Sequence, residues 1–329
     1  MPINTQKSIC QLENLPKPRE VSGVNSETFN EQVLEYYEPV VLRGFASDWE
    51  IVHLANNSLE SVANYLCKHD SGKTQRLVTT PAEANGRMFY NENLDGMNFS
   101  VQQTSLSSSI EQMLRRPEGI ESENHCIQSV SVRDNLPLLE EKFPNHVLKN
   151  STRSFIWIGN QMTVAPHFDE ASNIAVVAAG KRRFTFFPPE QIKNLYIGPL
   201  DFTPSGQPIS LVNLRDPDLK RFPRYEEAYK NAMSVELNPG DAIYIPSPWW
   251  HHVESLSKFN VLVNYWWSNA YVSSALPFPM LIHAIQALKN LPQGQVNAWE
   301  SILEHYLFDR SVDPAAHLPA GTAGILGDL

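Results

Sequence analysis

The sequence predicts a mainly β fold, an antiparallel sandwich or barrel with N-terminal α/β additions and C-terminal helices. Between residues 154 and 267, short runs of β-branched and aromatic residues follow one another closely. Turn sequences separate these runs, among them Gly180-Lys181 and the Asn-Pro-Gly-Asp tetrapeptide at 238–241. Short strands at this spacing are typical of antiparallel all-β architectures. Before and after this region, apolar residues recur at helical spacing.

The chain is long enough to bury a sizeable core. Its 329 residues are 42% hydrophobic and 19% charged, as in an ordinary globular protein. We expect one main domain with appendages: an N-terminal arm over 1–25, the main domain over 26–270, and C-terminal helices with a tail over 271–329. No internal repeat or low-complexity tract interrupts this arrangement.

The N-terminal part of the chain predicts helices and strands in alternation. Residues 1–25 are polar and contain Pro16 and Pro18, which favours an extended arm. Ser26 is a suitable N-cap for the helix that follows, and Pro39 ends that helix. The predicted helices cover 26–37, 58–69, 109–116 and 136–143, and the predicted strands cover 40–44, 75–79, 87–90 and 126–132.

The middle of the chain predicts a dense series of strands, and the last sixty residues predict helices. The predicted strands cover 155–158, 174–179, 184–187, 234–237, 242–245 and 261–267. After residue 267 the pattern changes to two amphipathic helices over 278–288 and 296–308, followed by a tail rich in Pro, Ala and Gly.

Charge and cysteine usage exclude several classes of protein. The net charge is −10 and the basic residues form no stripe, so we expect no nucleic-acid partner. Cys10, Cys67 and Cys126 are isolated, which argues against a disulfide framework and a thiolate zinc site. The apolar runs are too short to span a bilayer, and the first residues do not resemble a signal peptide. We therefore expect a cytoplasmic protein without a membrane partner.

The His167-Phe168-Asp169 tripeptide is the strongest candidate for a chemical site. If it lies on a strand, the imidazole and the carboxylate point to the same face, since side chains alternate with a period of two. A third ligand can come from His251 or His252, which follow a strand that begins at Gly-Asp. Two histidines and one carboxylate on one side of a metal suit non-haem Fe(II), because open positions remain for other ligands. Zinc is the alternative metal.

Four ordered motifs carry a resemblance to a known family. They are H-x-D at 167–169, G-K-R-R-F-T-F-F-P-P at 180–189, G-D-A-I-Y-I-P-x-x-W-W-H-H-V-E-S-L at 240–256, and V-N-Y-W-W at 263–267. In these motifs the chain resembles the cupin-like JmjC family of Fe(II)- and 2-oxoglutarate-dependent oxygenases, and within it the asparaginyl hydroxylases. The resemblance covers about two thirds of the chain. It implies a double-stranded β-helix of the cupin or jelly-roll type, with 26–270 as the catalytic domain.

The resemblance also implies which residues bind the metal. His167, Asp169 and His251 occupy the positions of the family's iron ligands. His251, directly after Trp249-Trp250, is the matching histidine of the adjacent pair. His252 should then point to the other side of its strand.

For the co-substrate 2-oxoglutarate, the resemblance implies a partly altered pocket. Arg182 stands where the family commonly has a Lys that holds the distal carboxylate, and guanidinium can bind a carboxylate through two hydrogen bonds. Asn173 and Asn264 match polar contacts. Two hydroxyl donors are replaced, a Thr by Val164 and a Tyr by Cys126.

The substrate itself is not encoded in a recognisable motif. By resemblance, Gln128 faces the substrate and Trp266 shapes the pocket wall, while segments 70–125 and 196–229 frame the mouth. We expect hydroxylation of a protein, peptide or small molecule, with succinate and carbon dioxide as products, rather than demethylation. The C-terminal helices are expected to form a homodimer. The alternative is a non-catalytic or 2-oxoglutarate-independent cupin that binds a metal or a carboxylate.

Overall fold

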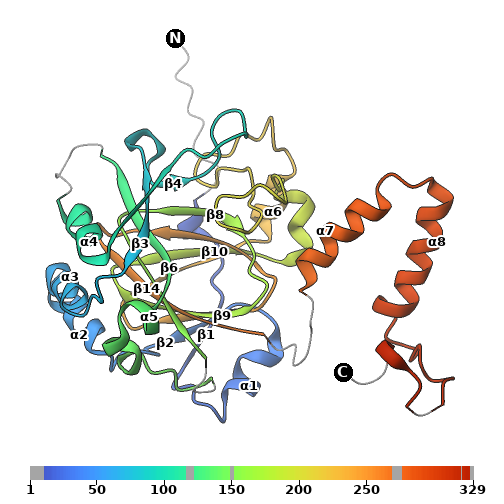
Figure 1. Ribbon diagram of the computed structural model, residues 1–329, viewed down its shortest axis with the longest axis horizontal. Coiled ribbons are helices and arrows are strands. Elements are labelled where there is room, and N and C mark those ends of the chain that lie inside the picture. Colours follow the sequence, from blue (N-terminus) through green and yellow to red (C-terminus); the bar gives the residue numbers. More distant parts are fainter. Residues whose placement is uncertain (1–10, 116–121, 149–151, 269–275, 320, 327–329) are drawn as a thin grey trace. The chain divides into compact units, whose positions relative to one another are not determined.

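The computed structural model describes residues 11–115, 122–148, 152–268, 276–319 and 321–326. The chain divides into two compact units, Met1–Trp267 and Ser268–Leu329. The first unit consists of two β-sheets with helices on the outside (Figure 1).

The larger sheet has nine strands. Its neighbours pair antiparallel except for the first two strands in the order, which are parallel. In spatial order the strands are β1 (Arg19–Ser22), β2 (Val40–Arg43), β12 (Ala242–Ile245), β9 (Ser172–Ala179), β14 (Asn260–Trp267), β7 (Ser154–Gly159), β6 (Asn124–Ser131), β3 (Thr74–Thr80) and β5 (Ser100–Ser105).

The smaller sheet has five strands and lies across from the larger one. In spatial order they are β11 (Met233–Leu237), β10 (Arg182–Phe187), β13 (Trp250–Ser255), β8 (Thr163–His167) and β4 (Arg87–Met88). Among the described residues no hydrogen-bonded ladder joins the two sheets. The mainly β prediction is confirmed, as is the double-stranded β-helix, whose sheets form a sandwich rather than a closed barrel.

Four helices of the first unit cover the outer face of the larger sheet. Along β9, Ile174 and Val176 point outward into the main hydrophobic core, whereas Ala175 and Val177 point between the sheets. Each aliphatic side chain buried in this way contributes roughly 1.5–3 kcal/mol. The covering helices are α2 (Glu50–Asn57), α3 (Leu59–Lys68), α4 (Leu106–Leu114) and α5 (Val132–Asn135). Ser58 caps α3 by accepting a hydrogen bond from the Ser61 backbone N–H at 3.1 Å.

The outer face of the smaller sheet is covered by the segment between β10 and β11. This segment contains a 3-10 helix (Pro189–Asn194) and α6 (Tyr225–Lys230). Its apolar side chains pack against Phe187 and Trp250, and Leu12 from the N-terminal segment is completely buried among them. Two-sided coverage explains why every residue of β10 and β13 is buried.

Residues 12–22, which belong to the N-terminal arm expected over 1–25, pack on the body of the fold. Leu12 is buried, Pro16 accepts a hydrogen bond from the Ser234 backbone N–H at 2.8 Å, and β1 extends the larger sheet. The sequence does not reveal this because one buried leucine in a polar stretch has no periodicity.

Most predicted elements of the first unit lie where the sequence places them. The helix expected over 26–37 is a short α1 (Phe29–Gln32) followed by a 3-10 turn (Leu34–Tyr36), and that over 136–143 is a 3-10 helix (Pro137–Lys142). Three helices, α2, α5 and α6, and two strands, β1 and β5, were not predicted. The first four residues of β5 are exposed and polar except for one valine, so they lack a strand-like apolar pattern. Short 3-10 turns also occur at Leu12–Asn14 and Ala82–Ala84.

The second unit is helical. It contains α7 (Pro277–Leu288), α8 (Gln293–Leu303), a π-helical turn (Glu304–Phe308) and a 3-10 turn (Gly324–Leu326). None of the residues of α7 and α8 is buried. Nowhere in the described part of the chain is there a helix of the length and apolar character needed to cross a bilayer.

Candidate metal centre and pocket

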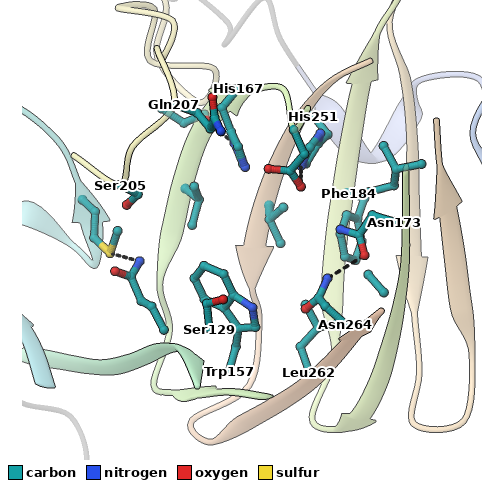
Figure 2. A pocket seen from close by; sticks show the side chains of 18 of the residues that line it. Ser129, Trp157, His167, Asn173, Phe184, Ser205, Gln207, His251, Leu262 and Asn264 are labelled. Carbon is teal, nitrogen blue, oxygen red and sulfur yellow. Dashed lines mark hydrogen bonds and ion pairs between the residues drawn. The ribbon is translucent and has the colours of Figure 1, made fainter. Parts of the chain in front are cut away.

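A cavity of about 220 Å³ lies between the two sheets (Figure 2). Its wall includes all the site residues expected from the sequence, namely His167, Asp169, His251, Asn173, Arg182, Asn264, Gln128 and Trp266. They come from both sheets and lie on or just after six strands, β6, β8, β9, β10, β13 and β14. The sandwich therefore brings into one cavity residues that lie up to 138 positions apart in the sequence.

His167, Asp169 and His251 converge at one end of this cavity. One potential ligand atom from each lies within 4.8 Å of those from the other two. The ring centroids of the two histidines are 4.2 Å apart, and His251 Nε2 is 3.8 Å from Asp169 Oδ2. The strand register explains the first contact, since His167 of β8 pairs directly with His251 of β13. Asp169 lies two residues beyond the end of β8.

Backbone hydrogen bonds orient both imidazoles toward the shared point. Nδ1 of His167 lies 2.9 Å from the carbonyl oxygen of Ala165, and Nδ1 of His251 lies 3.0 Å from that of Trp249. A carbonyl only accepts, so each Nδ1 carries the proton and each Nε2 keeps its lone pair for a ligand. Burial, reinforced by the neighbouring His167, lowers the pKa of His251 to about 4, which keeps its ring neutral at physiological pH.

Asp169 is oriented by contacts on both its carboxylate and its backbone. The indole Nε1 of Trp266 donates to Asp169 Oδ2 at 3.1 Å, and the hydroxyl of Ser247 donates to the Asp169 carbonyl at 2.8 Å. The hydrogen bond from Trp266 thus holds Asp169 Oδ2 at the cavity wall, beside His251. Such outer contacts typically fix the direction in which a ligand group points.

The adjacent His252 lies on the opposite face of β13. It is not among the residues that line the cavity, and its Nε2 is 4.0 Å from Glu254 Oε2. His251 and His252 are therefore separated by the alternation of the strand. As the sequence predicts, His251 faces the cavity and His252 faces away from it.

Arg182 projects into the cavity as a buried cation. Only 7% of the residue is exposed, and none of the described residues makes an ion pair or a hydrogen bond with it. Burial lowers its pKa to about 10. The neighbouring Arg183 points to the other face and pairs with Glu236 and Glu254. An unpaired buried guanidinium is unfavourable, so its surroundings fit an anionic ligand.

The two predicted asparagines form a buried pair. Asn264 Nδ2 donates to Asn173 Oδ1 at 2.9 Å, whereas Asn264 Oδ1 has no partner among the described residues (Figure 2). Gln128 Nε2 lies 3.3 Å from the sulfur of Met88. These amides add polar atoms to a wall that is otherwise largely apolar.

Several lining residues were missed by sequence reasoning. Trp157 and Leu262 face each other across the β7–β14 pair, and Ser205 and Gln207 reach the cavity from the segment between β10 and β11. Trp157 could have been found, since it alternates with Ile156 and Ile158, which belong to the outer core. Ser205 carried no signal because it lies in an irregular segment, although that segment was expected at the mouth.

Comparisons with known proteins place the chain in a family. Residues 26–273 match the profile of a cupin-like domain. Over 120 residues the chain is 36% identical to human HSPB1-associated protein 1, an alignment that covers 36% of this chain and 24% of that protein. Over 108 residues it is 35% identical to lysine-specific demethylase JMJ31 of Arabidopsis thaliana, covering 33% of this chain and 19% of the relative.

A longer alignment relates the chain to human tRNA wybutosine-synthesizing protein 5, with 25% identity over 279 residues, 78% of this chain and 79% of the relative. The chain spans about a quarter of the length of HSPB1-associated protein 1. The profile match, in contrast, extends over most of the chain and includes every residue of the cavity wall. The protein therefore belongs to the cupin-like, JmjC-type family.

Proposed function

We propose that this protein is an Fe(II)- and 2-oxoglutarate-dependent oxygenase that hydroxylates a protein side chain or a small molecule. The observation that supports this most strongly is the coexistence, in one cavity, of a His-Asp-His cluster and a buried arginine without an acidic partner. The cluster suits a metal and the arginine suits a carboxylate, and a 2-oxo dicarboxylate bridges both.

His167, Asp169 and His251 would hold the iron. Two imidazoles whose Nδ1 atoms are held by backbone carbonyls, together with one carboxylate, form the donor set that suits non-haem Fe(II), with zinc as the second choice. All three lie on one side of the cavity, which leaves the other side for further ligands. When bound, iron and 2-oxoglutarate together activate dioxygen for the oxidation of a substrate C–H bond, with succinate and carbon dioxide as products.

Arg182 would hold the distal carboxylate of 2-oxoglutarate. Between Arg182 and the histidines, the wall is formed by Phe184, Val253 and Val164, which occupy the same level of the smaller sheet. This apolar stretch suits the two methylene groups of the dicarboxylate and excludes water. Asn173 and Asn264 are placed to orient it through polar contacts.

The lining also favours hydroxylation over demethylation of a charged amine. Among the described residues, Asp169 is the only carboxylate that lines the cavity, and we assign it to the metal. No acidic group is then left to bind a methylated ammonium ion. Gln128 and Trp266 would contact the substrate instead.

The substrate class is proposed from charge and from the relatives. One relative is named for association with a protein and another for the synthesis of a tRNA base. A net charge of −10 is unfavourable for binding a polyanion, so we propose a protein, peptide or small-molecule substrate. Succinate release with basic peptides but not with tRNA would support this choice.

Anaerobic titration tests the proposed activity. Adding Fe(II) and then 2-oxoglutarate should produce the visible charge-transfer band of the chelate, and Asp169→Ala should abolish it. A chain that gives no band and no succinate would instead be the non-catalytic or 2-oxoglutarate-independent cupin that is the alternative.

We further propose that the second unit forms a homodimer with another copy. Its helices α7 and α8 have exposed apolar side chains, including Met280, Leu281, Trp299 and Ile302, and bury none of their residues. Apolar side chains exposed in such number typically mark an interface. Sedimentation at micromolar concentration should show a dimer, and the truncated chain 1–267 should be monomeric.

We also propose that the protein is cytoplasmic. Cys67 and Cys126 are free thiols, and Cys10 lies outside the described residues. Free cysteines fit a reducing compartment. Fractionation that found the protein outside the cytoplasm would contradict this proposal.

A further inference from the structure

We propose that Trp157 is a binding residue for the same dicarboxylate, donating its indole N–H to the distal carboxylate that Arg182 holds. This inference rests on the proposed function and extends it to a residue that the family pattern does not identify. Trp157 lines the cavity, and its Nε1 is buried without a hydrogen-bond partner among the described residues.

The strand registers place Trp157 at the end of the cavity away from the metal ligands. On β14, Trp266 bonds to Asp169, and Leu262, four residues earlier, pairs with Trp157. Four residues correspond to about 13 Å along a strand. Figure 2 shows the same separation, with His167 and His251 at one end and Trp157 and Leu262 at the other.

Arg182 lies at the corresponding level of the smaller sheet. It pairs with Ser255, which is four residues beyond His251 on β13. The two displacements are equal, and they run in the same direction because β9 ends beside Leu262, where Ala179 pairs with Val261, and leads directly into β10 at Arg182. Trp157 and Arg182 therefore approach the same end of the cavity from opposite sheets.

Cys126 provides an independent link between the two side chains. It pairs with Gly159, which lies two residues from Trp157 on the same face of β7. Burial raises the pKa of the Cys126 thiol to about 12, and the positive charge of Arg182 counteracts part of that rise. Trp157, Cys126 and Arg182 therefore surround one region.

The donors of this region explain what it would bind. Trp157 Nε1 and Arg182 Nε are both buried and both lack acceptors in the described structure. An unpaired buried N–H is unfavourable, and a carboxylate offers two oxygens that can accept from both. Val164 of the cavity wall has no donor, and the thiol of Cys126 is only a weak one. The indole N–H thus compensates for a donor that these positions lack.

The test compares two ligands that differ only at the distal end. Trp157→Phe removes the N–H and keeps an aromatic ring. The full-length protein with Fe(II) is titrated without oxygen, following the chelate absorbance, with 2-oxoglutarate and with 2-oxopentanoate, which has a methyl group in place of the distal carboxylate. We expect the variant to bind 2-oxoglutarate roughly 10- to 100-fold more weakly and 2-oxopentanoate with unchanged affinity.

Two further variants of this chain show whether a loss of affinity is specific to the indole N–H of Trp157. Trp267→Phe, outside the cavity wall, should change neither affinity. Replacing Trp157 with benzothienylalanine, which keeps the shape of indole but has no N–H, should reproduce the loss even if the phenylalanine variant folds poorly.

The outcomes separate this inference from the proposed function. If wild-type protein binds 2-oxoglutarate and the Trp157 variants bind it equally well, Trp157 is not a donor. An equal loss for both ligands would mean that Trp157 only packs, which also overturns the inference. If the wild-type protein forms no chelate at all, the proposed function fails and the inference fails with it.

Discussion

Replacing Arg182 with methionine should stabilise the protein and at the same time remove its affinity for a dicarboxylate. Methionine has a similar reach and no charge, so it can fill the same part of the cavity. The side chain of Arg182 is buried, and the described residues offer it neither an acid nor a hydrogen bond. Without ligand, the charge is therefore a cost to folding.

The size of this cost follows from the pKa of the guanidinium. Burial lowers that pKa to about 10, which at 1.36 kcal/mol per pKa unit corresponds to about 3 kcal/mol. At pH 7, below the pKa in both states, the group is charged in the folded and unfolded chains alike, so the full penalty is present. The penalty decreases only as the pH rises through about 10.

Denaturant unfolding with and without 2-oxoglutarate measures both effects. In the presence of metal, wild-type protein should gain about 2.7 kcal/mol at a ligand concentration of 100 times Kd. Arg182→Met should be about 3 kcal/mol more stable without ligand and should gain almost nothing when ligand is added.

Arg183→Met is the matched control on the same strand. Arg183 pairs with Glu236, Glu254 and Glu13 on the outer face, so its loss leaves the buried Glu254 short of a partner. This variant should lose about 2 kcal/mol or more and keep the full ligand response. If Arg182→Met is less stable than wild type and still responds to 2-oxoglutarate, our account of the cavity is wrong.

Three further substitutions test the metal centre and its support. His251→Ala should abolish Fe(II) binding in equilibrium dialysis, whereas His252→Ala should keep it; the reverse would shift the assigned register by one residue. Trp266→Phe removes the hydrogen bond to Asp169 and should weaken metal binding roughly tenfold or more in competition with a chromophoric chelator. Tyr265→Phe removes a 2.6 Å hydrogen bond to a buried backbone carbonyl and should lower the free energy of unfolding by about 1–3 kcal/mol, with unchanged metal affinity.

The sequence predicts the end of the cavity with the metal-ligand candidates well, because the side chains that meet there are selected by the alternation of side chains along a strand. His167 and Asp169 are two residues apart, and His251 and His252 are one apart, so strand geometry decides which side chains can meet. Leu12 shows the limit of such reasoning. It is buried by a segment nearly 200 positions away, and no local pattern reports a contact of that range.

Trp157 shows a second limit, since its position was predictable but its hydrogen-bonding state was not. Alternation on β7 places it on the inner face, where an indole could serve merely as packing. Only the three-dimensional surroundings show that its N–H is buried without an acceptor. The distinction between a packing residue and a binding residue lies in that missing partner.

Arg182 and Arg183 are adjacent on β10 and point to opposite faces of the strand. Both faces of the strand are buried, so hydrophobic pattern cannot tell Arg182 from Arg183. Their partners can: Arg183 meets glutamates from neighbouring elements, whereas Arg182 meets apolar walls and the cavity. A charge that the fold itself neutralises stabilises structure, and a charge left unpaired in a cavity is kept for a ligand.

Arg182 and Arg183 differ only in the face of β10 that they occupy. Exchanging their roles therefore requires a one-residue shift of β10, which would also move Phe184 and Phe186 out of the space between the sheets. The register that builds the core is therefore the same register that presents the unpaired charge of Arg182 to the cavity.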